Sequence, residues 1–166
     1  MDTVNYRPCV GIMLFNRSGL VFVGRRRKEN IPERLRQGYE WQMPQGGIDA
    51  GEDPYQAALR ELREETNVSS TTFLAESPDW YCYDLPSDGW RKSRGRFRGQ
   101  RQKWFALRFD GHESEINIDE PAGGQKPEFD AWRWETIGRL AELIIPFKRP
   151  VYDKVVETFG HLAEMR

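Results

Sequence analysis

Three glutamates, Glu61, Glu64 and Glu65, follow Arg60. Glu64 and Glu65 lie three and four residues after Glu61. Such spacings place side chains on one face of a helix, where each like-charged pair costs about 0.2–0.5 kcal/mol. A bound cation removes that repulsion, and clustered carboxylate oxygens suit Mg²⁺ or Mn²⁺, the ions that accompany phosphate chemistry. The residues therefore indicate a divalent metal site, with a solvated acidic helix face as the alternative.

A glycine-rich loop lies directly before this acidic stretch, at residues 46–52 (GGIDAGE). Glycines allow backbone amides and carbonyls to come close to an ion or a phosphate, because no Cβ intervenes. A helix that only displays charge to solvent needs no such loop. The loop therefore favours the metal site over the solvated acidic face.

The glutamates are predicted to lie on a helix over residues 54–66. Asp53 is a suitable N-cap because its carboxylate can accept hydrogen bonds from free backbone N–H groups, and Pro54 suits the first helical position. Asn67 tolerates the left-handed conformation that ends many helices. Apolar side chains at helical spacing predict a buried stripe on a different face, made of Tyr55, Ala58, Leu59 and Leu62.

The composition is that of a compact enzyme domain. The 166 residues are expected to form a single domain over residues 1–166, long enough to bury a substantial core. The two cysteines, Cys9 and Cys82, have no zinc-type spacing, which favours a reducing cytoplasm. We see no signal-peptide-like or membrane-spanning run, so no membrane partner is expected, and nothing indicates an obligate protein partner.

Positive charge is local, because the net charge of −1 gives no global field that attracts nucleic acid. One basic run covers residues 25–28. A second segment, between Trp90 and Trp104, mixes cations with Phe97 and glycines, a composition that suits a polyphosphate and its bases. A solvated loop is an equally good interpretation of this segment. Its cations are Arg91, Lys92, Arg94, Arg96, Arg98, Arg101 and Lys103.

The order of predicted elements indicates an α/β fold. Apolar runs at residues 10–15 and 20–24 flank a turn sequence and predict a hairpin. Further extended segments are expected at residues 41–44, 72–74, 80–85, 103–109 and 129–134. A closing helix with one apolar face starts near Pro150. Strands in this order, with two substantial helices, predict a mixed β-sheet sandwiched between α-helices.

The spacing of the loop and helix residues resembles the Nudix box, the signature of hydrolases that cleave nucleoside diphosphates linked to another moiety. The match covers residues 46–68 and reads G-x5-E-x7-R-E-L-x-E-E-x-N-V. It departs at one position, because the family usually has glycine where this chain has Asn67. Asparagine also visits the left-handed region, so the predicted metal site is hardly affected.

The resemblance extends over nearly the whole chain. Segments at residues 6–8, 41–47, 83–86, 99–105, 128–129 and 147–152 are similar to the bacterial RNA pyrophosphohydrolase subgroup. This implies a Nudix fold and removal of pyrophosphate from 5′-triphosphorylated RNA, which leaves 5′-monophosphate RNA for decay. Diadenosine tetraphosphate (dinucleoside polyphosphate) hydrolases share much of this set and are the main alternative. A nucleotide-binding Nudix-like regulatory module without catalysis is a remote alternative.

The resemblance also implies roles for the Nudix-box residues. Mg²⁺ or Mn²⁺ would be held by the helix glutamates and by one carboxylate from elsewhere in the chain, the complete set being Glu61, Glu64, Glu65 and Glu128. Glu64 is the first candidate for the general base. Arg60 would position the neighbouring carboxylates, Glu52 would brace the loop, and Asn67 would end the helix.

A further set of residues matches positions near the phosphates or the first bases of the substrate. Some have plain structural alternatives, because Phe147 could belong to the core and the cations could be surface charge. The expected substrate-binding residues are Arg7, Arg26, Gln45, Gly46, Gly47, Tyr83, Lys103, Phe147 and Lys148.

Overall fold

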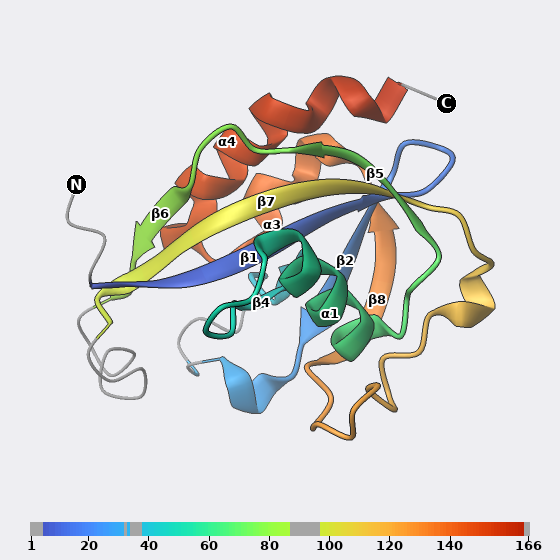
Figure 1. Cartoon of the computed structure of the whole chain (residues 1–166), viewed down its shortest axis with the longest axis horizontal. Helices are drawn as coiled ribbons and strands as arrows, with labels where there is room; N and C mark the ends of the chain where they lie inside the picture. The colour runs from blue at the N-terminus through green and yellow to red at the C-terminus, as the bar shows by residue number, and fades with distance from the viewer. Residues whose placement is uncertain (1–4, 32, 34–37, 87–96, 165–166) are drawn as a thin grey trace.

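The computed structural model describes residues 5–31, 33, 38–86 and 97–164. Eight strands in this part of the chain form one mixed sheet (Figure 1). Its main path runs β3-β2-β1-β7-β5, with β4 on β1, β6 on β7 and β8 on β2. The strands are β1 (Tyr6–Phe15), β2 (Val21–Arg26), β3 (Trp41–Gln42), β4 (Gln45–Gly47), β5 (Thr71–Glu76), β6 (Tyr81–Asp84), β7 (Gly99–Phe109) and β8 (Phe129–Glu135).

The two long strands β1 and β7 form the centre of the sheet and run side by side in Figure 1. They pair in parallel, with Tyr6 opposite Gly99 and Phe15 opposite Arg108. The strands next to them, β2, β4, β5 and β6, pair antiparallel. Successive residues of β1 therefore supply side chains alternately to two buried cores, one on each face of the sheet.

Helix α1 (Pro54–Thr66) covers one face of the sheet. Asp53 caps its start by accepting a hydrogen bond from the Gln56 backbone N–H at 3.1 Å, and Asn67 ends it in the left-handed conformation at φ 66°. The predicted bounds and both terminal residues are confirmed. The predicted buried stripe is wrong in part, because Tyr55 and Leu59 are only half-buried and Ala57 is buried instead.

The other face is covered by α3 (Leu140–Leu143) and α4 (Arg149–Phe159), on the side of the sheet away from α1 (Figure 1). Tyr152 of α4 contacts Trp104 of β7 edge-on, with ring centroids 5.8 Å apart, and neither side chain is exposed by more than 2%. Trp104 fits against β1 because Gly11 lies opposite; a Cβ there would collide with the indole ring. Helices on both faces confirm the predicted sandwich of a mixed sheet.

Two details differ from the prediction. Residues 41–44 do not form a single strand, because Met43 and Pro44 separate β3 from β4 and the glycines join β4. The short helix α3 was not expected. The closing helix begins at Arg149, next to Pro150, as predicted. Residues 91–96 of the basic segment between Trp90 and Trp104, which include Arg91, Lys92, Arg94 and Arg96, lie outside the described residues. Within the part of the chain described, no helix is long and apolar enough to cross a membrane.

Candidate active site

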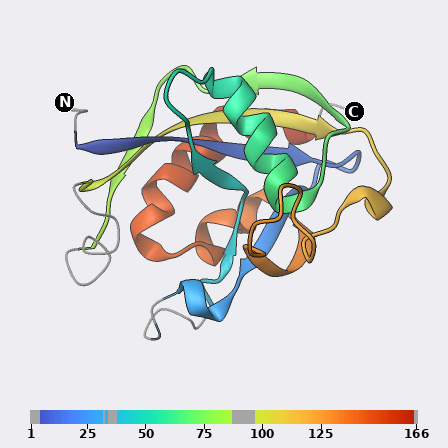
Figure 2. The same ribbon diagram turned by 60° about the horizontal axis from the view of Figure 1, so that its bottom comes forward.

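Four glutamates from two separate segments line one cavity of about 160 Å³. Glu61, Glu64 and Glu65 extend from α1, and Glu128 lies just before β8. Figure 2 shows the segment that leads into β8 passing close to α1. The side chain of Asn67 fixes this approach, because its amide donates to the carbonyls of Asn117 and Glu120 at 2.7 and 2.9 Å.

The glycines of β4 allow charged side chains to approach its backbone closely. A Cβ at Gly46 would collide with the carboxylate of Glu61, and one at Gly47 would collide with the guanidinium of Arg7. Both glycines therefore belong to the site for steric reasons. Arg7 also lies near enough to Glu61 to act on its ionisation, which brings this predicted phosphate-binding cation to the carboxylates.

Arg60 links the loop to the helix glutamates. Its Nε and Nη2 donate to both carboxylate oxygens of Glu52 at 2.9 Å, and Nη2 also donates to the carbonyl of Gly47 at 2.8 Å. Its Nη1 donates to Glu61 at 3.0 Å and to Glu64 at 3.1 Å. Because the guanidinium is planar and rigid, one side chain sets the positions of three carboxylates.

The Arg60 contacts and burial shift the carboxylate pKa values in opposite directions. Hydrogen bonding from Arg60 lowers the pKa of Glu52 to about 2. Burial raises the pKa of Glu61 to about 7, against the lowering effect of Arg60. Burial, followed by the charges of Glu128 and Glu61, raises the pKa of Glu65 well above its ordinary value. Burial and the neighbouring carboxylates therefore disfavour the charged forms of Glu61 and Glu65, which a bound cation would stabilise.

This donor set fits divalent cations. One carboxylate oxygen of Glu65, Oε2, is buried and has no hydrogen-bond partner among the residues that the structure describes. Such an atom costs about 1–3 kcal/mol when it is left unpaired, and a cation would satisfy it. Within the described residues, no three acidic, histidine or cysteine side chains lie close enough together to hold one ion.

Arg26, the last residue of β2, contacts one of the four cavity glutamates, Glu128. Its Nε lies 3.5 Å from the Glu128 carboxylate, and its Nη2 donates to the carbonyl of Asn30 at 2.9 Å. The backbone N–H of Arg27 also donates to the carbonyl of Glu128, at 3.2 Å. The junction of β2 and β8 thus holds Glu128 and a predicted phosphate-binding cation together.

Tyr83, Phe147 and Lys148 form a second group of predicted residues. The Tyr83 and Phe147 ring centroids are 5.7 Å apart, and the Lys148 ammonium lies 5.5 Å from the Tyr83 ring. Lys148 is almost fully buried, so its position is fixed. Lys103 is not part of this group; its ammonium lies 3.9 Å from Glu76 of β5, and no described contact places it beside the four glutamates.

The model of the NUDIX domain family matches residues 5–155 of this chain. The chain belongs to the NUDIX family. An RNA pyrophosphohydrolase from Rhodopseudomonas palustris is 58% identical over 163 residues, which cover 98% of this chain and 96% of that protein. An RNA pyrophosphohydrolase from Rhizobium meliloti is 54% identical over 162 residues, which cover 97% of each.

Solved structures share the NUDIX fold at much lower identity. An Ap4A hydrolase from C. elegans has a TM-score of 0.62 at 15% identity, covering 93% of this chain and 98% of that one. The dihydroneopterin triphosphate pyrophosphohydrolase of E. coli has a TM-score of 0.63 at 18% identity, covering 92% and 97%. At these identities the likeness concerns the fold alone.

Sequence reasoning missed three residues that line the cavity of this NUDIX protein: Pro121, Gln125 and Lys126. Lys126 is the informative omission, because it adds a cation to the four carboxylates. A lysine after two glycines and a glutamine was the only signal, and it does not distinguish a site loop from an ordinary surface loop.

Proposed function

We propose that the protein is an RNA pyrophosphohydrolase, which removes pyrophosphate from 5′-triphosphorylated RNA and leaves 5′-monophosphate RNA. The proposal rests on four carboxylates around one cavity, in a chain 58% identical to an RNA pyrophosphohydrolase. Both cysteines are free thiols, which suits the reducing cytoplasm where we place the enzyme.

The cofactor that we propose is Mg²⁺ or Mn²⁺, held by Glu61, Glu64, Glu65 and Glu128. When bound, such ions neutralise phosphate oxygens and lower the pKa of a coordinated water. The unpaired Oε2 of Glu65 and the hard carboxylate oxygens support this choice over softer metals.

Glu64 is the general base of the proposed reaction. It is the more exposed of the two glutamates that Arg60 holds, with 27% of its side chain accessible against 15% for Glu61. Arg60 fixes one of its oxygens, so the other is available to take a proton from the attacking water. The water oxygen would bond to the α-phosphorus as the anhydride bond between the α- and β-phosphates breaks, and pyrophosphate would leave with the electrons of that bond.

Cations around the cavity would stabilise the charge that develops on the phosphates. Arg7 lies over Gly47, Arg26 lies beside Glu128, and Lys126 lines the cavity itself. Positive groups fixed in advance stabilise a phosphoryl-transfer transition state without further reorganisation. These three residues would therefore bind the triphosphate end rather than the body of the RNA.

The Tyr83–Phe147–Lys148 group would bind the first nucleotides. The half-buried Phe147 ring offers a stacking face for a base, while Tyr83 and Lys148, which are buried beside it, would hold that ring in place and add a positive charge nearby. Base stacking on an aromatic side chain is worth about 1–3 kcal/mol. This supports an RNA end over a free nucleoside triphosphate, which has only one base to bind.

The test compares wild type with Glu64→Gln in pyrophosphate release from 5′-triphosphorylated RNA, with Mg²⁺ or Mn²⁺ and with a chelator. We expect turnover to fall at least 100-fold in Glu64→Gln, and in wild type with chelator, while the unfolding curve is unchanged. Glu142→Gln is the matched control, because Glu142 is exposed and distant from the cavity. Wild-type turnover in Glu64→Gln would contradict the assigned base.

The same preparations decide between substrates. We expect a larger kcat/KM on triphosphorylated RNA than on diadenosine tetraphosphate. The reverse preference would reassign the enzyme to dinucleoside polyphosphates and keep the chemistry. Absence of metal-dependent turnover on both substrates would overturn the catalytic proposal and leave a binding module.

A further inference from the structure

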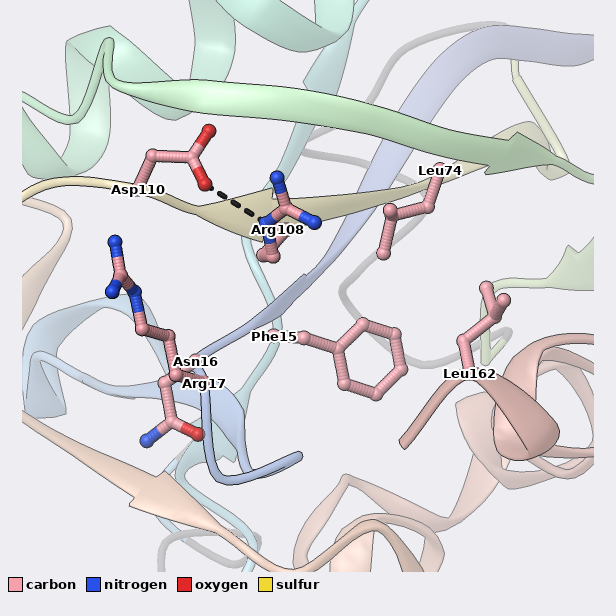
Figure 3. A pocket seen from close by; sticks show the side chains of 7 residues that line it. All are labelled: Phe15, Asn16, Arg17, Leu74, Arg108, Asp110 and Leu162. Atoms are coloured by element: carbon pink, nitrogen blue, oxygen red, sulfur yellow. Dashed lines mark hydrogen bonds and ion pairs between the residues drawn. The ribbon is translucent and has the colours of Figure 1, made fainter. Parts of the chain in front are cut away.

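A second cavity, of about 300 Å³, lies on the α4 face of the sheet, away from α1 and its glutamates. It opens where β1 and β7 end and the C-terminal turn of residues 160–164 passes over them. Figure 3 shows its lining residues, which share no member with the carboxylate cavity. They are Phe15, Asn16, Arg17, Leu74, Arg108, Asp110 and Leu162.

The cavity has an apolar floor. Phe15 of β1 and Leu162 of the C-terminal turn are buried, with 2% and 7% of their surface exposed, and Leu74 of β5 is half-buried beside them. All three belong to or contact the core under α4. The ring or short aliphatic chain of a small ligand would therefore pack against that core without displacing polar contacts.

The wall of the cavity is held in place by its own contacts. The Asn16 carboxamide oxygen accepts from the backbone N–H groups of Ser18 and Leu20, each at 2.9 Å, which closes the β1–β2 turn. Gly19 lies against the Ala163 carbonyl so closely that a Cβ would collide with it. The turn and the C-terminal residues are thus fixed against each other, and the space between them is preformed.

The rim carries one uncompensated positive charge. Arg108 donates from Nε to Asp110 at 2.9 Å, so this pair is neutral as a unit. Arg17 is exposed and makes no hydrogen bond or ion pair with any residue the structure describes, although its charge acts on Asp110. Figure 3 places its guanidinium at the rim, on the side of Asp110.

We propose that this cavity binds a compact monocarboxylate whose apolar body lies on Phe15, Leu74 and Leu162 and whose carboxylate pairs with Arg17. One uncompensated cation matches one negative charge. The volume is at the lower end for small-molecule sites, which limits the body to one or two rings or a short chain. The site stands independently of the hydrolase proposal, because none of its residues contributes to the carboxylate cavity.

The test is an amide NMR titration of the full chain with indole-3-carboxylate and, as an uncharged partner of nearly the same shape, indole-3-carboxamide. We expect the carboxylate to shift amide signals at residues 15–19, 108–110 and 162, and to bind more tightly than the carboxamide. Arg17→Gln is expected to weaken the carboxylate about tenfold, the effect of losing a charge-assisted hydrogen bond. Binding of the carboxamide should be unchanged in this variant.

Arg63→Gln is the matched control, because Arg63 is another exposed arginine and lies on α1, on the opposite face. It should bind both probes as wild type does. Leu74→Trp fills the floor and is expected to abolish binding of both probes, with a cooperative unfolding curve showing that the fold persists. Equal affinity for the two probes, equal carboxylate affinity in Arg17→Gln, or shifts confined to α1 would each overturn the proposal.

Discussion

The side-chain amide of Gln102 donates to the Oε1 of Gln45 at 2.9 Å, which joins the central strand β7 to the strand that carries the site glycines. The same amide donates to Gln100 at 3.0 Å, and the Gln102 carbonyl oxygen accepts from the Trp104 indole N–H at 3.0 Å. Gln102 is only 1% exposed. The backbone of Gln45 in turn hydrogen-bonds the carboxyl group of Glu65. A chain of hydrogen-bonded amides, buried at Gln100 and Gln102 and half-buried at Gln45, therefore connects β7 to a ligand of the candidate metal site.

Replacing Gln102 with leucine should therefore destabilise the protein by about 1–3 kcal/mol. The substitution removes the partners of a buried indole N–H and of the Gln45 carboxamide, and unpaired buried groups cost roughly that amount. Urea unfolding measures the change, with Gln56→Leu as the control because Gln56 is exposed on α1. A Gln102→Leu protein as stable as the control variant would show that the amide chain contributes nothing.

Glu52→Gln should lower stability at neutral pH and lose this effect in acid. The Arg60 hydrogen bonds lower the folded-state pKa of Glu52 to about 2, below its ordinary value of 4.5. A lowered pKa stabilises the folded state fully above about 4.5, and that contribution is lost as the pH falls towards 2. At pH 7 we expect a loss of about 1.5 kcal/mol, the low end for hydrogen bonds to charged groups, because solvent reaches the pair.

Urea unfolding of wild type and Glu52→Gln at pH 7 and pH 3 provides the measurement. The difference in unfolding free energy between the two proteins should be smaller at pH 3. Glu142→Gln should show little difference at either pH, since its contact with Arg139 is 4.0 Å long and exposed. A difference that grows in acid would contradict the assigned role of Glu52.

Asn67 should stabilise the protein more than the glycine that its family usually has at this position. Both residues accept the left-handed φ of 66°, but only asparagine donates to the carbonyls of Asn117 and Glu120. Asn67→Gly should cost about 1 kcal/mol for the lost hydrogen bonds. Asn67→Ala should cost about 1 kcal/mol more, because alanine is strained in the left-handed region.

Thermal unfolding compares the stabilities of wild type, Asn67→Gly and Asn67→Ala. Hydrogen exchange shows which backbone amides lose protection in the variants. The backbone amides of residues 119 and 120 should exchange faster in Asn67→Gly than in wild type, because the segment loses two of its hydrogen bonds to the end of α1 and keeps the one from the Asn117 N–H to the Thr66 carbonyl. Unchanged exchange there, together with unchanged stability, would mean that the two hydrogen bonds do not hold the segment that leads to Glu128.

Local signals were sufficient for α1. Its cap at Asp53, the proline at the first helical position and the left-handed Asn67 all act within one or two turns, so the bounds follow from neighbouring residues. The acidic face follows from the same period. The parallel pairing of β1 with β7 does not, because it joins segments that are far apart in the sequence (Tyr6 pairs with Gly99) and depends on side-chain packing such as Trp104 on Gly11.

The amide chain shows why part of the site stayed hidden. Along β7, Gln100 and Gln102 alternate with Arg101 and Lys103, so both faces of the strand are polar in sequence. Hydrophobic alternation therefore cannot say which face is buried, and the structure buries the glutamines. Glu128 was placed by family resemblance alone, since a single glutamate before a strand has no local pattern of its own.

Glu65→Gln should stabilise the metal-free protein while removing its response to metal. The substitution deletes one charge from the cluster and replaces the unpaired buried Oε2 with a group that needs no counter-ion, which we expect to add about 1 kcal/mol. Wild type should gain stability in Mn²⁺, by about 2.7 kcal/mol at a concentration 100 times the Kd. Glu65→Gln should gain much less, because it has lost a ligand.

Thermal unfolding in chelator and in millimolar Mn²⁺ measures both effects, with Glu142→Gln as the control that should behave as wild type in each condition. The diagnostic result is a variant that is more stable than wild type in chelator and less stable than wild type in Mn²⁺. A plain structural role for Glu65 would make the variant less stable in both conditions. If Mn²⁺ raises the unfolding temperature of wild type and Glu65→Gln equally, Glu65 is not a ligand. If it raises neither, the four glutamates of the cavity do not bind this ion without substrate.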